Sequence, residues 1–489
     1  MNEILAYSLM LGTLAFFGYV GYQAASEKEL DQDTYLSARG TQNWVRIGLS
    51  LFASGMGIWI LFGPSEVGYW GGFWDVVGYA VSAATPFLLL AYVGPMIRER
   101  IPDGVTLADY VRMRIGRPMQ LYVGLISVIY MFTFLFAEFT AIGKAMEVLV
   151  GMKPLIPMLA VAIVTSAYTA YGGLPASLQT DRWQAWVVMW LIVVLFLFLF
   201  ANDVGTIISQ AKAANPEGDI DWSIGSMSYM DSFSSGLALV VAITAAEMFS
   251  QGNWQRTYAS KDDDALKKGA FLAAGLVFPL VFIMGVLGTV VAGRGHAADP
   301  SAAFFLLIED AHILLISGFV ILGIALVCSS VDTLQNAISA SITRDISDGK
   351  MGLKQARIAT LVMIPVAIYL ATGPTIAGFT FDAIGVFEIF LFADLLAAAT
   401  VLPVLLTLWD RVDSKAALAG GVCGLLSVVV YGTVTADLST GVEYIFSPTN
   451  EYGLANLWVF LSALIGSGFV TIAGSLMMPK ESIVSTEQS

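Results

Sequence analysis

Long apolar segments recur along the whole chain. Uninterrupted apolar runs of this length are typical of helices that cross a bilayer, whereas buried core helices are shorter. The two-residue alternation of barrel strands is missing from these segments, so we do not expect an outer-membrane barrel. The pattern predicts an all-α polytopic membrane protein with about thirteen transmembrane helices. The predicted spans are residues 4–23, 44–65, 72–97, 119–149, 155–171, 183–201, 233–251, 267–292, 302–342, 356–372, 379–408, 416–434 and 454–478.

Composition supports this class of protein. Of 489 residues, 57% are hydrophobic and 13% are charged, about half the charge that soluble proteins carry. Much of the acid behind the net charge of −14 lies in polar loops at residues 202–231 and 436–451, which indicates a solvated exterior. No basic patch, nucleotide-binding loop or nucleophile–base pair is present. We therefore expect neither an enzyme nor a nucleic-acid partner, and the sequence indicates no protein partner.

The positions of Lys and Arg predict the orientation. If the N-terminus lies outside, 20 of the 24 basic residues fall in cytoplasmic segments. The positive-inside rule then predicts an odd number of spans, an outer N-terminus and a cytoplasmic C-terminus in the inner cell membrane. The first span is preceded by Glu3 and no basic residue, unlike a cleaved signal peptide, so we expect it to be retained.

Two spans carry helix breakers within the membrane. The second predicted span contains residues 53–57, which read Ala-Ser-Gly-Met-Gly, and the seventh ends at residues 249–253, Phe-Ser-Gln-Gly-Asn. Paired interruptions in two halves of a chain are typical of inverted-repeat transporters, which bind their solute where the backbone unwinds. A single glycine in such a helix more often permits close packing, but two breaks five spans apart favour a transporter.

Three motifs appear in order along the chain. Residues 48–56 form the first, residues 171–184 link into the sixth span, and residues 328–333 contain an adjacent serine pair followed by Asp332 and Thr333. In this order, from about residue 35 to residue 479, the chain resembles the sodium/solute symporter family, which includes sodium/proline, galactose, sialic acid, pantothenate and urea transporters.

This resemblance implies a LeuT-type core of two inverted five-helix repeats. Five regions follow from it: a peripheral first helix and linker (1–43), the first repeat (44–201), an extracellular loop (202–232), the second repeat (233–408), and two peripheral helices with a short tail (409–489).

The resemblance also implies a sodium ion as the bound cofactor. Sodium prefers several oxygen ligands, which a membrane helix supplies from hydroxyls, carboxylates or freed carbonyls. Carried over residue by residue, the site consists of the carbonyls of Ala53, Met56 and Leu326 and the hydroxyls of Ser329 and Ser330. An isolated membrane serine more often bonds a carbonyl of its own helix, but an adjacent pair opposite a broken helix favours sodium.

A second sodium site or an exit path is implied at Asp181, Asp332 and Thr333, because some relatives use an acid and hydroxyls at these places. A carboxylate inside a span is a functional candidate by default, although a neutral, hydrogen-bonded Asp332 that only orders helices fits the sequence equally well. Asp394 either lines the solute path or packs against polar neighbours.

The substrate is less defined by sequence. Residues 250–256 and 72–74 look closest to the urea and polyamine branch, whereas Trp59 is similar to the proline branch. Ala246 falls where the sugar branch has an aromatic gate, which disfavours a bulky sugar. We predict Trp59, Glu247 and Gln251 as substrate-binding residues.

Glu247 needs a cation or a proton at membrane depth. An amine on the substrate, the sodium ion, Lys144 and a bound proton all satisfy this need, and so does a structural role within the bundle.

Together these features predict sodium-coupled symport of a small polar organic solute, such as urea, an amine or an amino acid, by alternating access. A sodium-independent or proton-coupled facilitator is the alternative. A sensory membrane module of the same fold is a further one, disfavoured because only about ten residues follow the last predicted span.

The orientation can be tested by cysteine labelling. We expect a cysteine at Gly218 to react with an impermeant maleimide from outside, and one at Asp263 to react only after the membrane is opened. The reverse pattern would invalidate the predicted topology.

Overall fold

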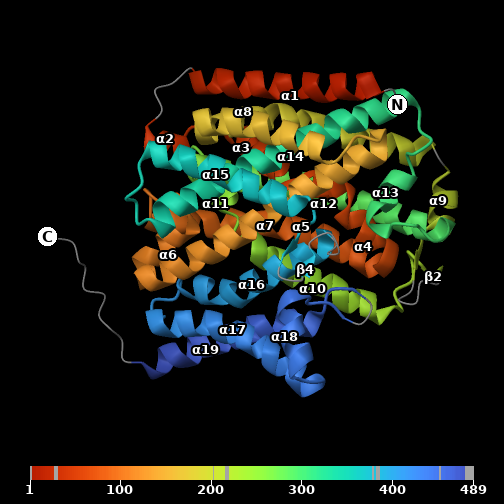
Figure 1. The fold of residues 1–489 in the computed structure, drawn as a ribbon. Coiled ribbons are helices and arrows are strands. Elements are labelled where there is room, and N and C mark those ends of the chain that lie inside the picture. Colours follow the sequence, from red (N-terminus) through yellow and green to blue (C-terminus); the bar gives the residue numbers. More distant parts are fainter. Residues whose placement is uncertain are drawn as a thin grey trace.

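The computed structural model describes residues 3–26, 31–201, 203–214, 220–376, 379–380, 386–450 and 453–478. Gly218, the outer labelling position, lies outside these residues. Long helices run side by side through the molecule (Figure 1). The helices before the first strand are α1 (Glu3–Ser26), α2 (Gln32–Ser37), α3 (Trp44–Gly55), η1 (Ile58–Leu61), α4 (Gly63–Gly71), α5 (Phe73–Arg100), α6 (Leu107–Ile115), α7 (Arg117–Val150), α8 (Leu155–Ala201) and α9 (Val204–Gln210).

The second half is also helical. Its helices are α10 (Met230–Glu247), α11 (Gln251–Ala259), α12 (Asp263–Arg294), η2 (Pro300–Ala302), α13 (Ala303–Leu306), α14 (Ile313–Ala340), the π-helical η3 (Ser341–Ile346), α15 (Leu353–Ala371), α16 (Val386–Leu406), α17 (Ser414–Thr435), α18 (Leu438–Phe446) and α19 (Leu457–Met477). Two short antiparallel hairpins lie between helices, β1 (Lys212–Ala214) with β2 (Ile220–Ser223) and β3 (Thr375–Ile376) with β4 (Phe379–Thr380).

The predicted count of thirteen spans is not confirmed. Within the described ranges, eleven helices are long and apolar enough to cross a membrane, or twelve when the bent pair formed by residues 44–55 and 58–71 is taken as one span. The difference lies in α8, one element of 47 residues that contains two of the predicted spans. At 1.5 Å per residue it would extend about 70 Å if straight, more than twice the thickness of a bilayer core.

Gly173 divides α8 into two helices. Its φ and ψ of 57° and −146° lie in a region that is essentially restricted to glycine. A Cβ atom there would also come within 2.5 Å of the backbone oxygen and ring of Tyr35. The backbone therefore turns at this residue, two positions before Pro175, which cannot donate a helical hydrogen bond.

Two other predicted spans begin later than expected. The span predicted from residue 302 corresponds to α14, which starts at Ile313, because residues 300–306 form the short elements η2 and α13 instead. The span predicted from residue 379 corresponds to α16, which starts at Val386, because residues 379–380 pair with residues 375–376 as a hairpin. Short apolar stretches next to a long span extend its hydropathy signal without extending its helix.

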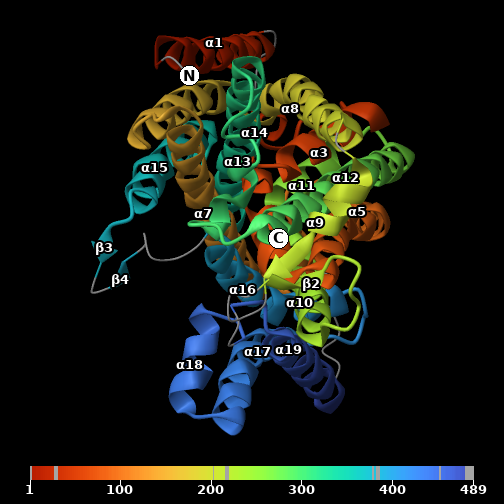
Figure 2. The same ribbon diagram turned by 90° about the vertical axis from the view of Figure 1, so that its right-hand side faces the viewer.

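The helices form a core with a covering layer at each side. Helix α1 lies along one edge and packs against α8 and α14, while α17, α18 and α19 lie together at the opposite edge (Figures 1 and 2). Helix α16 contacts α7 and α10 within the core and α17 and α19 outside it. The core therefore consists of the segments between α3 and α16.

Both predicted helix breaks are present. The first separates α3 from η1 at Met56 and Gly57, with a bend of 60°, and the second separates α10 from α11 at residues 248–250. Helix α14 packs against α3, η1 and α11. The unwound backbone of both breaks thus lies beside one helix, which carries the predicted serine pair.

Gly173 provides a test of the α8 turn. We expect Gly173→Ala to destabilise the protein by roughly 1–3 kcal/mol from backbone strain alone, and by more if Tyr35 cannot move. The measurement is the melting temperature of the purified protein in detergent. Gly12→Ala is the control, because a Cβ at Gly12 meets nothing within 4 Å. Equal melting temperatures for the two variants would contradict the assigned role of Gly173.

Candidate functional site

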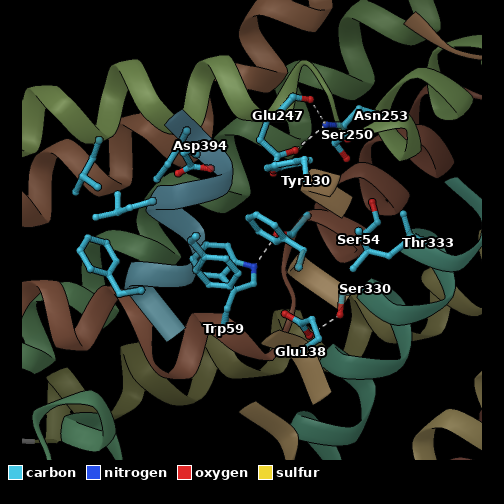
Figure 3. A pocket seen from close by; sticks show the side chains of 18 of the residues that line it. Ser54, Trp59, Tyr130, Glu138, Glu247, Ser250, Asn253, Ser330, Thr333 and Asp394 are labelled. Atoms are coloured by element: carbon cyan, nitrogen blue, oxygen red, sulfur yellow. Dashed lines mark hydrogen bonds between the residues drawn. The ribbon is translucent and has the colours of Figure 1, made fainter. Parts of the chain in front are cut away.

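A cavity lies between the two broken helices (Figure 3). It is bounded by the segments at both breaks and by α5, α7, α14 and α16. The residues that line it are Ser54, Gly55, Trp59, Tyr79, Tyr130, Phe134, Glu138, Leu239, Ile243, Glu247, Ser250, Asn253, Ser330, Thr333, Leu334, Phe387, Phe390, Leu391 and Asp394.

Aromatic rings form much of the wall. The ring of Trp59 stacks on Tyr79 with centroids 5.8 Å apart, and the ring of Phe134 stacks on Phe390 at 4.3 Å. The indole nitrogen of Trp59 donates to the carbonyl of Gly55 at 3.3 Å, which holds the ring beside the first break. Aromatic walls of this kind can pack against the methylene groups of a ligand. The negative faces of the rings can also attract a cationic group.

Glu247 is the last residue of α10, at the second break. Its Oε1 atom accepts a hydrogen bond from the hydroxyl of Tyr130 at 2.9 Å, and its Oε2 atom accepts one from the Asn253 amide at 2.9 Å (Figure 3). Both partners are neutral. Lys144, which we considered as its partner, forms an ion pair with Asp299 at 2.7 Å instead. The carboxylate of Glu247 therefore has hydrogen-bond donors but no cation among the described residues.

Two further carboxylates line the cavity. Glu138 on α7 is 1% exposed, and its Oε2 atom accepts hydrogen bonds from the Ser330 hydroxyl at 2.6 Å and from the Ile58 N–H at 3.0 Å. Asp394 on α16 is 2% exposed. No described residue forms a hydrogen bond with Asp394 Oδ1 or Glu138 Oε1. None of the described residues that line the cavity is Lys, Arg or His, so its side chains are acidic without compensation.

The five predicted sodium ligands come from the first break and from one stretch of α14. The Ala53 carbonyl accepts from the Met56 N–H at 3.2 Å, and the Leu326 carbonyl oxygen lies 3.2 Å from the Ser330 hydroxyl oxygen. Helix α14 packs against both α3 and η1, which brings these segments together. Ser330 also lines the cavity, whereas Ala53, Met56, Leu326 and Ser329 do not.

Asp181 has a partner that the sequence did not predict. Its Oδ2 atom forms an ion pair with Arg256 at 2.7 Å, and both side chains are fully buried. Ser50 donates to the same oxygen, and Ser329 donates to Oδ1 at 2.7 Å. The Arg256 guanidinium also donates to Thr333 at 2.8 Å and to Ser50 at 2.7 Å. A guanidinium thus contacts two groups, Asp181 and Thr333, that were predicted to serve a second sodium ion or an exit path.

Asp332 lies in a neighbouring cluster of hydroxyls. It accepts hydrogen bonds from Tyr168 at 2.6 Å, Ser177 at 2.6 Å and Thr180 at 3.1 Å. These donors belong to both halves of α8, so Asp332 joins α14 to α8 across the turn at residue 173. This arrangement agrees with the ordering role that the sequence left open for Asp332.

The three predicted substrate residues do not lie together. Trp59 and Glu247 line the cavity, but Gln251 does not. The Gln251 amide donates to Ser127 at 2.8 Å and accepts from the Leu107 N–H at 2.8 Å. These bonds join the start of α11 to α6 and α7.

Sequence reasoning missed Glu138, Tyr130 and Arg256. Glu138 carries a usable signal, because a carboxylate inside a predicted span is a functional candidate by default. Tyr130 and Arg256 carry none, because their importance comes from partners more than 70 residues away in the chain.

Solved structures share this fold. An outward-open sodium-coupled sialic acid symporter superposes with a TM-score of 0.77 at 17% identity, covering 98% of this chain and 99% of that one. Mhp1, a nucleobase-cation-symport-1 family transporter, superposes with a TM-score of 0.55 at 14% identity, covering 93% and 98%. These likenesses confirm the LeuT-type fold, although the count of thirteen spans stays a prediction.

Sequence relatives include transporters of different solutes. The spermidine transporter DUR31 of Candida albicans is 31% identical over 88% of this chain and 79% of its own length. The sodium/proline symporter 2 of Staphylococcus saprophyticus is 24% identical over 86% and 83%. The model of the sodium:solute symporter family matches residues 35–424. With broken helices around a central cavity and this match over most of its length, the chain belongs to the sodium:solute symporter family and is a membrane transport protein.

Proposed function

We propose that this protein is a sodium-coupled importer of an amine-bearing organic cation. One observation carries the proposal: among the described residues, the cavity between the broken helices is lined by three carboxylates and no basic side chain. Carboxylates at membrane depth are costly unless a cation or a proton accompanies them. A substrate with ammonium groups provides the missing positive charge.

Glu247 is the first candidate partner for an ammonium group. Its two oxygens are held by neutral donors, Tyr130 and Asn253, which orient the carboxylate and leave its charge uncompensated. Ring walls that include Trp59 and Phe134 offer apolar and cation–π contacts to the rest of the molecule. The Candida relative, described as a spermidine transporter, supports an amine over urea or an amino acid.

The arrangement of the serine pair supports sodium as the coupling ion. A hydroxyl that donates its proton to a carboxylate keeps its lone pairs for a cation. Ser329 donates to Asp181 and Ser330 donates to Glu138, so both hydroxyl protons are placed on carboxylates. The carbonyls of Ala53, Met56 and Leu326 complete the proposed set of oxygen ligands.

Alternating access follows from the same architecture. The solute and the ion would bind where the two broken helices face α14, and movement of one repeat against the other would expose this place to each side in turn. A sodium-independent or proton-coupled carrier, or a sensor with this fold, would bind its ligand at the same place without the sodium response described next.

The sodium ligands are tested by removing single hydroxyls. We expect Ser329→Ala and Ser330→Ala each to raise the sodium concentration for half-maximal uptake, because each removes one oxygen ligand. A loss of about 1–2 kcal/mol corresponds to a roughly five- to thirty-fold change. The measurement is uptake into proteoliposomes over a range of sodium concentrations. Ser339→Ala on the same helix is the control, because Ser339 donates to the Ala356 carbonyl away from the site.

Two results would change the proposal. If both serine variants keep the wild-type dependence of uptake on sodium, the two serines are not sodium ligands, and the coupling ion binds at another place in the protein. A wild-type protein that ignores sodium would be a facilitator, a proton-coupled carrier or a sensor.

Glu247 is tested by neutralising its charge. We expect Glu247→Gln to weaken binding of an amine by about ten-fold or more, because hydrogen bonds to charged groups are worth about 1.5–3 kcal/mol. Sodium affinity should be unchanged, and uptake of neutral urea should be equal in variant and wild type. Affinities for putrescine, choline, proline and urea are measured in both proteins. Glu147→Gln, an exposed change on α7, is the matched control. Joint loss of sodium and amine binding would place Glu247 in the ion site instead.

A further inference from the structure

Glu138 has an unusual position for a buried carboxylate. It projects from α7 to the first helix break, where its Oε2 atom accepts the N–H of Ile58, the first residue of η1, at 3.0 Å. The same oxygen accepts the Ser330 hydroxyl at 2.6 Å. Its other oxygen, Oε1, is buried and has no hydrogen-bond partner among the described residues. One oxygen is therefore anchored, and the other lies buried without a hydrogen-bond donor.

Gly57 makes this approach possible. A Cβ atom at position 57 would lie 2.0 Å from Glu138 Oε1, closer than any real contact. The φ of Gly57 is −75°, which any residue adopts, so its backbone conformation does not require glycine. The missing side chain instead leaves the space that the carboxylate of Glu138 occupies.

The Ile58 N–H is a backbone donor freed by the break. In transporters with broken helices, such donors are where anionic groups of a substrate bind. In this protein the donor already holds Glu138, and the nearby Ser330 hydroxyl donates to the same carboxylate. A substrate carboxylate arriving here would find these donors occupied and would meet a negative charge.

Two of the three acidic residues on the cavity wall, Glu138 and Glu247, lie at separate places. Figure 3 shows Glu138 beside Ser330 at one end, and Glu247 beside Tyr130 and Asn253 at the other, with Trp59 between them. The wall between the two ends is mainly aromatic and aliphatic. A chain of methylene groups with an ammonium at each end matches this order of acidic, apolar and acidic surfaces.

We infer that Glu138 determines substrate class: it replaces the carboxylate of an amino acid and binds one ammonium group of a di- or polyamine, while Glu247 binds the other. This inference rests on the proposed transport of amines. It assigns the two carboxylates different tasks, because only Glu138 occupies the freed backbone donor. The protein accordingly selects diamines over monoamines and over amino acids with the same carbon chain.

Three ligands that share one carbon chain test this. Putrescine has an amine at each end, butylamine lacks one amine, and ornithine is putrescine with a carboxylate added. We expect wild-type protein, in sodium and by calorimetry, to bind putrescine at least ten-fold more tightly than either of the others. Agmatine and arginine form a second pair that differs only by the carboxylate, and agmatine should bind at least ten-fold more tightly.

Variants then separate the two acids. Glu138→Gln should bring putrescine affinity to within three-fold of butylamine and remove the discrimination against ornithine. Glu138→Asp keeps the charge and should still prefer putrescine to ornithine. Glu247→Gln should weaken butylamine and putrescine alike, and the exposed change Glu147→Gln should alter nothing.

Several results would overturn the inference. Equal wild-type affinity for putrescine and ornithine would do so whatever the variants show. A Glu138→Gln protein that keeps the full preference for putrescine would make Glu138 structural. A shift in sodium affinity with unchanged ligand preference would make it a sodium ligand. Failure of wild-type protein to bind any amine would instead remove the proposed function itself.

Discussion

The ion pair between Asp181 and Arg256 lies where four segments of the core meet. It illustrates the constraint that acts on the whole interior, namely that a charge buried at membrane depth is costly unless an opposite charge accompanies it. Both side chains are fully buried, and their hydrogen-bond partners include Ser50 from α3 and two residues of α14, Ser329 and Thr333. Breaking such a pair by removing one partner costs several kcal/mol, because the other charge is left uncompensated. The pair therefore holds the inner parts of both broken helices against α8 and α14.

The central cavity presents the opposite situation. Asp181 has a guanidinium and two hydroxyl donors, whereas Glu138, Glu247 and Asp394 have no cation among the residues described. The same low-dielectric environment acts on all four carboxylates. A chain that neutralises one buried acid with an arginine and leaves three others facing a cavity keeps their charge for something that enters the cavity. The proposal of an amine substrate rests on this contrast more than on any single contact.

Much of the fold could be predicted from the sequence because bilayer thickness imposes long apolar helices and because glycine runs interrupt them. The breaks at residues 56–57 and 248–250 fall within or beside the segments that the residue pattern predicted. Long-range pairing is different, since Tyr130 and Glu247 are 117 positions apart and no local pattern joins them. The same reason explains Gln251: its neighbours resemble a motif, but its side chain bonds to the first residue of α6 and to Ser127 within α7.

The partners of Asp181 also bear on how many sodium ions the protein needs. Its Oδ2 accepts from Arg256 and Ser50 and its Oδ1 from Ser329, so a second sodium ion would have to displace or share these donors. Energetically a second ion is not required for a cationic substrate. Each positive charge that moves inward gains about 2.3 kcal/mol per 100 mV of membrane potential. One sodium ion with a doubly charged amine would gain about 7 kcal/mol at ~100 mV, before any sodium gradient is counted. An Asp181 that is paired with Arg256, together with a single sodium site at the first break, is therefore consistent with steep accumulation of an organic cation.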